Sequence, residues 1–288
     1  MKLGELLREG VARLGETAVP DAENDAKLLL FAAFRTDLTH FLLDRGRELS
    51  GEEPDTSCVA HYRAMIAKRR GRLPLQQILG SQTFMGLEFE VNEQVLIPRQ
   101  DTETLVERVL EEQQERRLRL LDLCTGSGCI AVSLAVLGGY RYVTGTDVSA
   151  AALATARRNA ARLAAGCTGK IEFFCGDLFE AVPAGMAAFD VITANPPYIP
   201  TEVIATLEPE VRDHEPLLAL DGSADGLAFY RRIARKLGRY LAPGGSIYLE
   251  IGWDQADAVC ALLQECGLES IRVVKDLPGK DRVVCGRK

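Results

Sequence analysis

The sequence predicts an α/β fold in which a mostly parallel seven-stranded sheet follows a small N-terminal helical domain and a β-hairpin linker. Three observations lead to this prediction. From residue 101 onward, apolar segments of strand length alternate with segments of helical period. The first 80 residues show helical periodicity alone, and the apolar pattern between Phe84 and Ile97 favours extended structure. Apolar strands separated by helices are typical of a parallel sheet that is covered on both faces.

The helical domain is expected over residues 1–80. A 3.6-residue period runs through Leu3–Leu14. A second helix is expected to begin after Asp21, placed as its N-cap, and to run to residue 34. A third is expected over about 55–70, because glycine and proline follow it.

The linker, residues 81–100, is expected to form a hairpin with a turn at Asn92-Glu93. The sheet domain, residues 101–288, is expected to begin with a helix at about 101–117. Strands are predicted at 118–123, 142–147, 170–175, 189–194, 246–251, 268–274 and 282–286. Further helices are predicted at 128–138, 149–164, 223–241 and 253–266. The last two strands are expected to pair antiparallel, because only a short link joins them.

The charge balance argues against a nucleic-acid partner. The chain carries 34 Lys and Arg against 41 Asp and Glu, and its net charge of -7 repels a phosphate backbone. A local exception is the basic cluster, which consists of Arg63, Lys68, Arg69, Arg70 and Arg72. We expect this cluster to form a solvent-exposed helix face; the alternative is a contact for an acidic or ribosomal partner.

Cysteine spacing, apolar runs and the first residues argue against other classes of protein. The 8 cysteines form no C-x-x-C pair and the 3 histidines lie apart from them, so we expect reduced, buried thiols and no metal site. No apolar run reaches the ~18 residues of a membrane span. The first ten residues mix charges with leucines, whereas a signal peptide separates them, so a cytoplasmic protein without a membrane partner is expected.

A glycine loop follows the first strand of the sheet domain. Thr125, Gly126, Ser127 and Gly128 lie where this strand meets the next helix, and glycine lets the backbone approach a ligand at the helix N-terminus. Asp147 ends the next strand and is placed to accept both hydroxyls of a ribose. Three interpretations remain open at this point: S-adenosylmethionine, a dinucleotide such as NAD, or a tight turn that holds no ligand.

A second acidic residue ends the third strand. The Asp177 carboxylate is placed to accept a hydrogen bond from the amine of an adenine ring, which Leu178 or Phe179 would cover. The alternative is that Asp177 caps the helix that follows it.

The fourth strand ends in Asn195-Pro196-Pro197-Tyr198, the most informative segment of the chain. Two prolines fix φ and remove two backbone donors, which leaves the Asn195 side-chain oxygen and the Pro196 carbonyl as acceptors. Acceptors suit a planar –NH₂ group, which must donate two hydrogen bonds. The Tyr198 ring adds an electron-rich face beside that group. The alternative is a rigid turn at the end of a strand.

These motifs resemble a known family. Asp122-Leu-x-Thr-Gly-Ser-Gly128 together with Asn195–Tyr198 is similar to the amino-group methyltransferases of the class I S-adenosylmethionine-dependent fold, which has a Rossmann-like seven-stranded sheet. More closely, the chain resembles the HemK/PrmC family of release factor glutamine N5-methyltransferases. The segments that carry the closer resemblance are Pro74–Gly80, Phe84–Phe89, Leu96–Glu103, Val211–Gly222, Asp225–Tyr230 and Asp276–Arg282.

The resemblance implies methyl transfer from S-adenosylmethionine to the N5 amide nitrogen of the glutamine in the Gly-Gly-Gln loop of class I peptide-chain release factors. It also implies that the helical domain docks this partner. It implies catalytic roles for Asn195, Pro196 and Tyr198, with Pro197 added to them for substrate binding. It implies cofactor contacts at Thr125, Gly126, Ser127, Gly128, Asp147, Asp177, Leu178 and Asn195.

The chain departs from the family pattern at two positions. Cys124 stands where family members usually have glycine, and its side chain is expected to crowd the methionine part of the cofactor or to lower its affinity. Gln100 stands where a second proline is common, which is expected to loosen the loop beside the site. Neither departure removes a residue with an implied catalytic role.

Other functions remain open from the sequence. A glutamine methyltransferase that acts on a ribosomal protein would have nearly the same pocket. An adenine or guanine amino-group methyltransferase of nucleic acid shares Asn195–Tyr198, but the net charge opposes it. An NAD-dependent oxidoreductase, or a cofactor-binding module without catalysis, would share the glycine loop. No catalytic His or Tyr-Lys pair supports the oxidoreductase.

Overall fold

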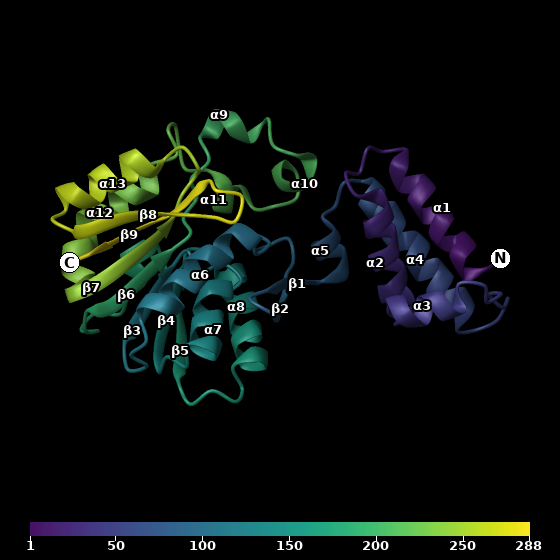
Figure 1. Ribbon diagram of the computed structural model, residues 1–288, viewed down its shortest axis with the longest axis horizontal. Coiled ribbons are helices and arrows are strands. Elements are labelled where there is room, and N and C mark those ends of the chain that lie inside the picture. Colours follow the sequence, from purple (N-terminus) through teal and green to yellow (C-terminus); the bar gives the residue numbers. More distant parts are fainter. The chain divides into compact units, whose positions relative to one another are not determined.

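Seven strands form one sheet with the order β5-β4-β3-β6-β7-β9-β8 (Figure 1). The computed structural model describes residues 1–288. Strands β5, β4, β3, β6 and β7 run parallel, whereas β9 pairs antiparallel with β7 and β8. The strands are β3 (Arg119–Leu123), β4 (Tyr142–Asp147), β5 (Lys170–Cys175), β6 (Phe189–Ala194), β7 (Leu241–Glu250), β8 (Glu269–Lys275) and β9 (Asp281–Arg287). The predicted sheet and its antiparallel end are confirmed.

Helices cover both faces of this sheet (Figure 1). Val191 and Tyr248 pack in one core with α6, α7 and α8, whereas their neighbours Ile192 and Leu249 pack in the other core with α12 and α13. This alternation follows from the two-residue period of a strand. The helices are α6 (Gln100–Glu112), α7 (Cys129–Leu137), α8 (Ala150–Leu163), α12 (Ala228–Tyr240) and α13 (Ala256–Glu265). None of the helices is both long and apolar enough to cross a membrane.

The linker hairpin is present, but the turn predicted for it is wrong. β1 (Ser81–Phe84) pairs with β2 (Leu87–Glu90), and the turn lies at Met85-Gly86 rather than at Asn92-Glu93. Both turn residues have positive φ, 51° and 73°, as a type I′ hairpin turn requires. Asn92 lies after β2, where its Nδ2 donates a hydrogen bond to Thr155 Oγ1 at 3.0 Å. The strand pair is therefore shorter than the apolar pattern indicates.

The sequence does not predict the short helices, because one or two turns are too few to show a helical period. They are α3 (Leu38–Asp44), α5 (Leu75–Leu79), the 3-10 helix η1 (Leu178–Ala181), α9 (Thr201–Ile204), α10 (Pro209–Arg212) and α11 (Leu217–Leu220). The last three belong to one long loop between β6 and α12. This loop is closed at its base, where Ile199 N donates to Leu220 O at 3.0 Å and Gly222 N donates to Ile199 O at 2.8 Å. The connection after β6 is therefore an ordered loop.

The helical part of the chain forms a unit of its own, which consists of Met1–Gly80 and Glu208–His214. The three predicted helices are present as α1 (Leu3–Gly15), α2 (Ala22–Phe34) and α4 (Asp55–Arg70), and they share one apolar core. Asp21 precedes α2 as expected, but its side chain accepts no capping hydrogen bond. The segment Glu208–His214 was expected in the sheet domain, yet it packs with these helices. We call it the anchor segment.

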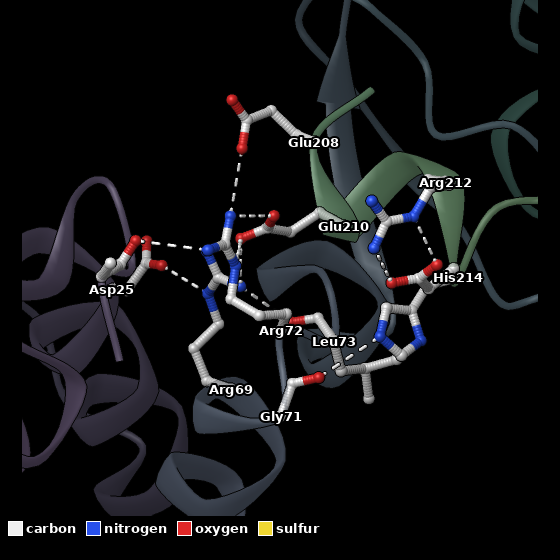
Figure 2. Close-up of polar contacts among 11 residues, drawn as sticks. Asp25, Arg69, Gly71, Arg72, Leu73, Glu208, Glu210, Arg212 and His214 are labelled. Carbon is white, nitrogen blue, oxygen red and sulfur yellow. Dashed lines mark hydrogen bonds and ion pairs between the residues drawn. The ribbon is translucent and has the colours of Figure 1, made fainter. Parts of the chain in front are cut away.

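Two arginines hold the anchor segment to the helices of this unit (Figure 2). Arg69 Nε lies 2.6 Å from Asp25 Oδ2, and Arg69 Nη1 lies 2.8 Å from Glu210 Oε1. Arg72 Nε and Nη2 lie 2.7 and 2.5 Å from the two carboxylate oxygens of Glu210. At the other end of the segment, His214 Nε2 lies 3.3 Å from the Gly71 carbonyl oxygen. Arg69 is only 5% exposed, so its ion pairs form the buried part of this network, whereas Arg72 and Glu208 are more exposed.

The basic cluster forms the predicted solvent-exposed face only in part, because Arg63, Lys68 and Arg70 are exposed whereas Arg69 is buried and Arg72 is partly buried. Arg63 pairs with Glu9, Arg70 with Glu16, and Arg72 with Glu208 and Glu210. The acidic partners belong to the same chain. Local sequence could not reveal the main one, because Glu210 lies 141 residues after Arg69.

We expect replacement of Arg69 by Met to destabilise the helical unit, because it leaves the carboxylates of Asp25 and Glu210 without this cation in a buried site. The expected loss in the free energy of unfolding is about 3 kcal/mol, at the lower end of the cost of breaking a buried pair. Arg70→Met is the control: its ion pair with Glu16 is exposed, and its loss costs at most about 1 kcal/mol. Urea unfolding followed by circular dichroism measures both, and equal losses would contradict the buried network.

Candidate active site

A cleft lies at the carboxyl ends of the parallel strands, where ligands bind in open α/β sheets. It has a volume of about 1170 Å³, including space open to solvent, and is therefore large enough for a ligand of nucleotide size. The chain segments that follow four neighbouring strands line it: Cys124–Ser127 after β3, Asp147–Ser149 after β4, Asp177 and Leu178 after β5, and Asn195 and Pro197 after β6.

The glycine loop after β3 has an unusual backbone. Cys124, Gly126 and Gly128 all have positive φ, at 55°, 54° and 80°. A Cβ at Gly126 would meet no atom within 4 Å, so the loop leaves open space there. A Cβ at Gly128 would lie 3.1 Å from the Ala156 Cβ, so this glycine allows the close approach of α8. The loop therefore combines room for a ligand at Gly126 with tight helix packing at Gly128.

Asp147 supports this loop and faces the cleft. Its Oδ2 accepts a hydrogen bond from Gly126 N at 2.9 Å, and its Oδ1 accepts one from Ser149 N at 2.8 Å. Burial raises the pKa of this carboxyl, and the backbone hydrogen bonds oppose that effect. Each carboxylate oxygen keeps a further lone pair. Asp147 therefore lies at the cleft with acceptor capacity that these two hydrogen bonds do not use.

A buried carboxyl beneath the loop holds it from the strand side. Asp122 is 1% exposed, and it accepts hydrogen bonds from Thr125 Oγ1 at 2.6 Å and Thr193 Oγ1 at 2.9 Å. Burial raises the pKa of Asp122 to about 7, although both hydroxyls lower it. Asp122 thus links the glycine loop to β6, the strand that ends at Asn195.

The acid after β5 already has a partner. Asp177 Oδ2 lies 2.5 Å from Arg232 Nη2, and both side chains are partly exposed. Asp177 makes no side-chain capping bond to η1, so the alternative role of a helix cap is not realised. Leu178 is buried and lines the cleft together with Phe229, an aromatic residue of α12. A ligand amine at Asp177 would share the carboxylate with Arg232.

The segment after β6 brings Asn195 and Pro197 to the cleft, and two of its oxygens accept no hydrogen bond from a backbone N–H. Asn195 Nδ2 lies 3.3 Å from Thr102 Oγ1, which leaves Asn195 Oδ1 as the free end of this amide. No backbone N–H is bonded to the carbonyl oxygen of Pro196, a buried residue. Tyr198 is placed differently from the prediction. It does not line the cleft, and its carbonyl oxygen accepts a hydrogen bond from Gln255 Nε2 at 3.0 Å.

The structure brings together most of the residues predicted for the site. Those that line the cleft are Thr125, Gly126, Ser127, Asp147, Asp177, Leu178, Asn195 and Pro197. Those that do not are Gly128, Pro196 and Tyr198. The sequence prediction missed several lining residues, including Arg99, Thr102, Pro216, Leu218 and Phe229. They come from α6 and its N-cap, from the loop after β6 and from α12, and only the folded sheet brings these segments to one edge.

The strand order, the glycine loop and the carboxylate that ends β4 together define a class I methyltransferase. Two family models match the chain: a PrmC N-terminal domain over residues 5–80 and a methyltransferase domain over residues 120–214. A solved methyltransferase structure from Pyrococcus furiosus is similar with a TM-score of 0.52, covering 80% of this chain and 98% of that one. Its sequence is 17% identical, so this likeness shows the fold alone.

Two curated relatives identify the family. The release factor glutamine methyltransferase of Geobacter sulfurreducens is 42% identical over 95% of this chain and 92% of its own length. That of Cereibacter sphaeroides is 40% identical over 100% of this chain and 99% of its own length. The chain belongs to the release factor glutamine methyltransferase family, and the resemblance found in the sequence is confirmed.

The positive φ of Cys124 leads to a stability prediction. A residue with a Cβ is strained in the left-handed region, whereas glycine is not. We therefore expect Cys124→Gly to unfold with a free energy about 1 kcal/mol higher than Cys124→Ala, the reverse of the usual order. Both variants lack the thiol, so the difference between their free energies of unfolding reports the backbone strain at residue 124. Urea unfolding measures the difference, and a Cys124→Ala protein as stable as Cys124→Gly would contradict the strain.

Proposed function

We propose that this chain transfers a methyl group from S-adenosylmethionine to the N5 amide nitrogen of the glutamine in the Gly-Gly-Gln loop of class I peptide-chain release factors. The acceptor corner formed by Asn195 and Pro196 carries the proposal, because Asn195 Oδ1 and the Pro196 carbonyl match the two N–H groups of a primary amide. Family membership supports the same substrate, since both relatives are named release factor glutamine methyltransferase.

The cleft residues fit S-adenosylmethionine. Asp147 offers carboxylate lone pairs for the ribose hydroxyls, and the open space at Gly126 gives the ligand access to the backbone. Leu178 and Phe229 supply apolar surface for an adenine ring, whose amine has Asp177 as an acceptor. When bound, this cofactor supplies a methyl group attached to a positively charged sulfur.

In this proposal the protein works by positioning the amide. An amide nitrogen is a poor nucleophile because its lone pair is delocalised into the carbonyl. Asn195 Oδ1 and the Pro196 carbonyl accept hydrogen bonds from the two N–H groups of the substrate amide and so fix the plane of the amide. These hydrogen bonds become stronger as positive charge develops on the nitrogen, so they stabilise the transition state more than the ground state. The displaced proton leaves to water, and no side chain is required as a base.

Replacing Asn195 by Ala tests the acceptor corner. We expect kcat to fall ~10²–10³-fold at nearly unchanged stability, the effect of removing one acceptor that acts mainly in the transition state. Asn24→Ala, in α2 and outside the cleft, is the matched control and is expected to keep the parental kcat. Single-turnover methylation of a purified release factor measures both. If Asn195→Ala methylated the factor at the parental rate, Asn195 would not have this role.

The substrate is tested by mass spectrometry after incubation with S-adenosylmethionine. We expect one added methyl group on a release factor, mapped to the glutamine of its Gly-Gly-Gln loop. Ribosomal proteins and total nucleic acid are offered in parallel, because enzymes that act on them would have a similar acceptor corner. Methylation of either of these, with an unmodified release factor, would overturn the proposed substrate.

The docking role of the helical domain predicts a difference between substrates. A chain without residues 1–80 is expected to bind S-adenosylmethionine normally, because the cleft lies wholly in the other unit. We expect it to lose at least about tenfold in kcat/KM on a whole release factor but little on a short Gly-Gly-Gln peptide. The peptide serves as the control, because the deletion also removes the partners of the anchor segment. Equal losses on the two substrates would refute docking.

A further inference from the structure

One arginine of α12 contacts two residues that line the cleft. Arg232 Nη2 lies 2.5 Å from Asp177 Oδ2, and the central carbon of its guanidinium lies 5.4 Å from the centroid of the Phe229 ring. Asp177 and Phe229 both line the cleft, whereas Arg232 does not. The two lining residues come from different segments, since Asp177 follows β5 and Phe229 belongs to α12. Arg232 therefore links these two residues from outside the cleft.

The Asp177 carboxylate depends on Arg232 for its direction. The side chain of Asp177 is 51% exposed and makes no capping bond to η1, and its carboxylate is hydrogen-bonded by Arg232 alone. A half-exposed aspartate has several rotamers open to it, and the ion pair selects one of them. Because Arg232 occupies Oδ2, Oδ1 is left to accept a hydrogen bond from a ligand.

The same guanidinium restrains the Phe229 ring. A guanidinium within about 6 Å of a ring centroid is attracted to the electron-rich face of the ring. An adenine ring needs both an apolar surface and an acceptor for its amine, and these are what Phe229 and Asp177 offer. Arg232 thus fixes the position of the acceptor relative to the apolar surface.

Other contacts hold α12 against η1. The rings of Phe179 and Tyr240 are stacked, with centroids 4.5 Å apart and planes 12° from parallel. Lys236 of α12 pairs with Glu180 of η1. Loss of the Arg232 guanidinium is therefore expected to leave the helix in place and to free only the side chains of Asp177 and Phe229.

We propose that Arg232 is a positioning residue that orients Asp177 and Phe229 for the adenine ring of the cofactor, and that it thereby contributes to recognition of the 6-amino group. The inference rests on the proposed function for the identity of the cofactor. Arg232 itself need not touch the ligand.

Two ligands that differ at the 6-position test this role by titration calorimetry on the full chain. In S-inosylhomocysteine an oxygen replaces the 6-amino group of S-adenosylhomocysteine, and an oxygen acceptor does not bond to a carboxylate. We expect the parental protein to prefer S-adenosylhomocysteine at least about tenfold. In Arg232→Met, we expect the Kd of S-adenosylhomocysteine to rise about fivefold, because the ligand must then order both side chains. The preference is expected to fall to about threefold or less, because S-inosylhomocysteine never used the oriented carboxylate.

Arg231→Met is the matched control. Arg231 of the same helix pairs with Asp225, also at 2.5 Å, and these side chains are 42% and 49% exposed, against 39% and 51% for Arg232 and Asp177. Asp225 does not line the cleft. Arg231→Met therefore removes an equivalent charge and ion pair, and it is expected to keep the parental Kd for both ligands.

Two results would overturn the inference. An equal loss of affinity for both ligands in Arg232→Met would indicate a general disturbance of the cleft. An unchanged or lower Kd for S-adenosylhomocysteine would show that Arg232 does not prepare the carboxylate, or that it competes with the ligand for it.

The binding measurements also separate this inference from the proposed function, because they need no release factor. If the parental protein bound S-adenosylhomocysteine but left release factors unmethylated, the proposed substrate would fail, whereas the Kd values would still decide the role of Arg232. If the parental protein bound no S-adenosylhomocysteine, both proposals would be overturned.

Discussion

The two consecutive prolines after β6 are the constraint on which the site depends. Neither residue has a backbone N–H, so neither can donate a hydrogen bond to a neighbouring strand or within a helix. Asn195 consequently lies at the cleft with its Oδ1 unbonded, and the carbonyl oxygen of the buried Pro196 accepts no backbone hydrogen bond. The two prolines therefore leave this segment with hydrogen-bond acceptors and without two backbone donors.

The rest of the sheet edge supports this corner through buried acids. Asp122 accepts hydrogen bonds from Thr125 of the glycine loop and from Thr193 of β6, and Asp147 accepts one from Gly126 of the same loop. Burial raises the pKa of both carboxyls. Such groups cost stability in an interior, and they persist where they hold loops in a fixed geometry.

Much of this architecture could be predicted because its signals are local. The strands β4, β5 and β6 begin and end at the predicted residues, since each is rich in β-branched and aromatic residues. The site residues at the ends of β3, β4 and β6 were predicted because parallel strands bring their carboxyl ends to one edge. The helix predicted over 101–117 ends earlier, at Glu112, because its amphipathic pattern stops there.

The features that escaped prediction depend on contacts distant in the sequence. Glu210 and Arg69 pair across 141 residues, so each charge seemed to belong to an exposed segment. The position of the hairpin turn at Met85-Gly86 was predictable from local sequence, because glycine favours the positive φ that this turn adopts.

A crystal structure of the protein with S-adenosylhomocysteine and a Gly-Gly-Gln peptide tests the central claim most directly. The account predicts that the glutamine amide nitrogen lies within about 3.2 Å of both Asn195 Oδ1 and the Pro196 carbonyl oxygen. A glutamine amide turned away from these two oxygens, or bound through Asn195 Nδ2, would contradict it.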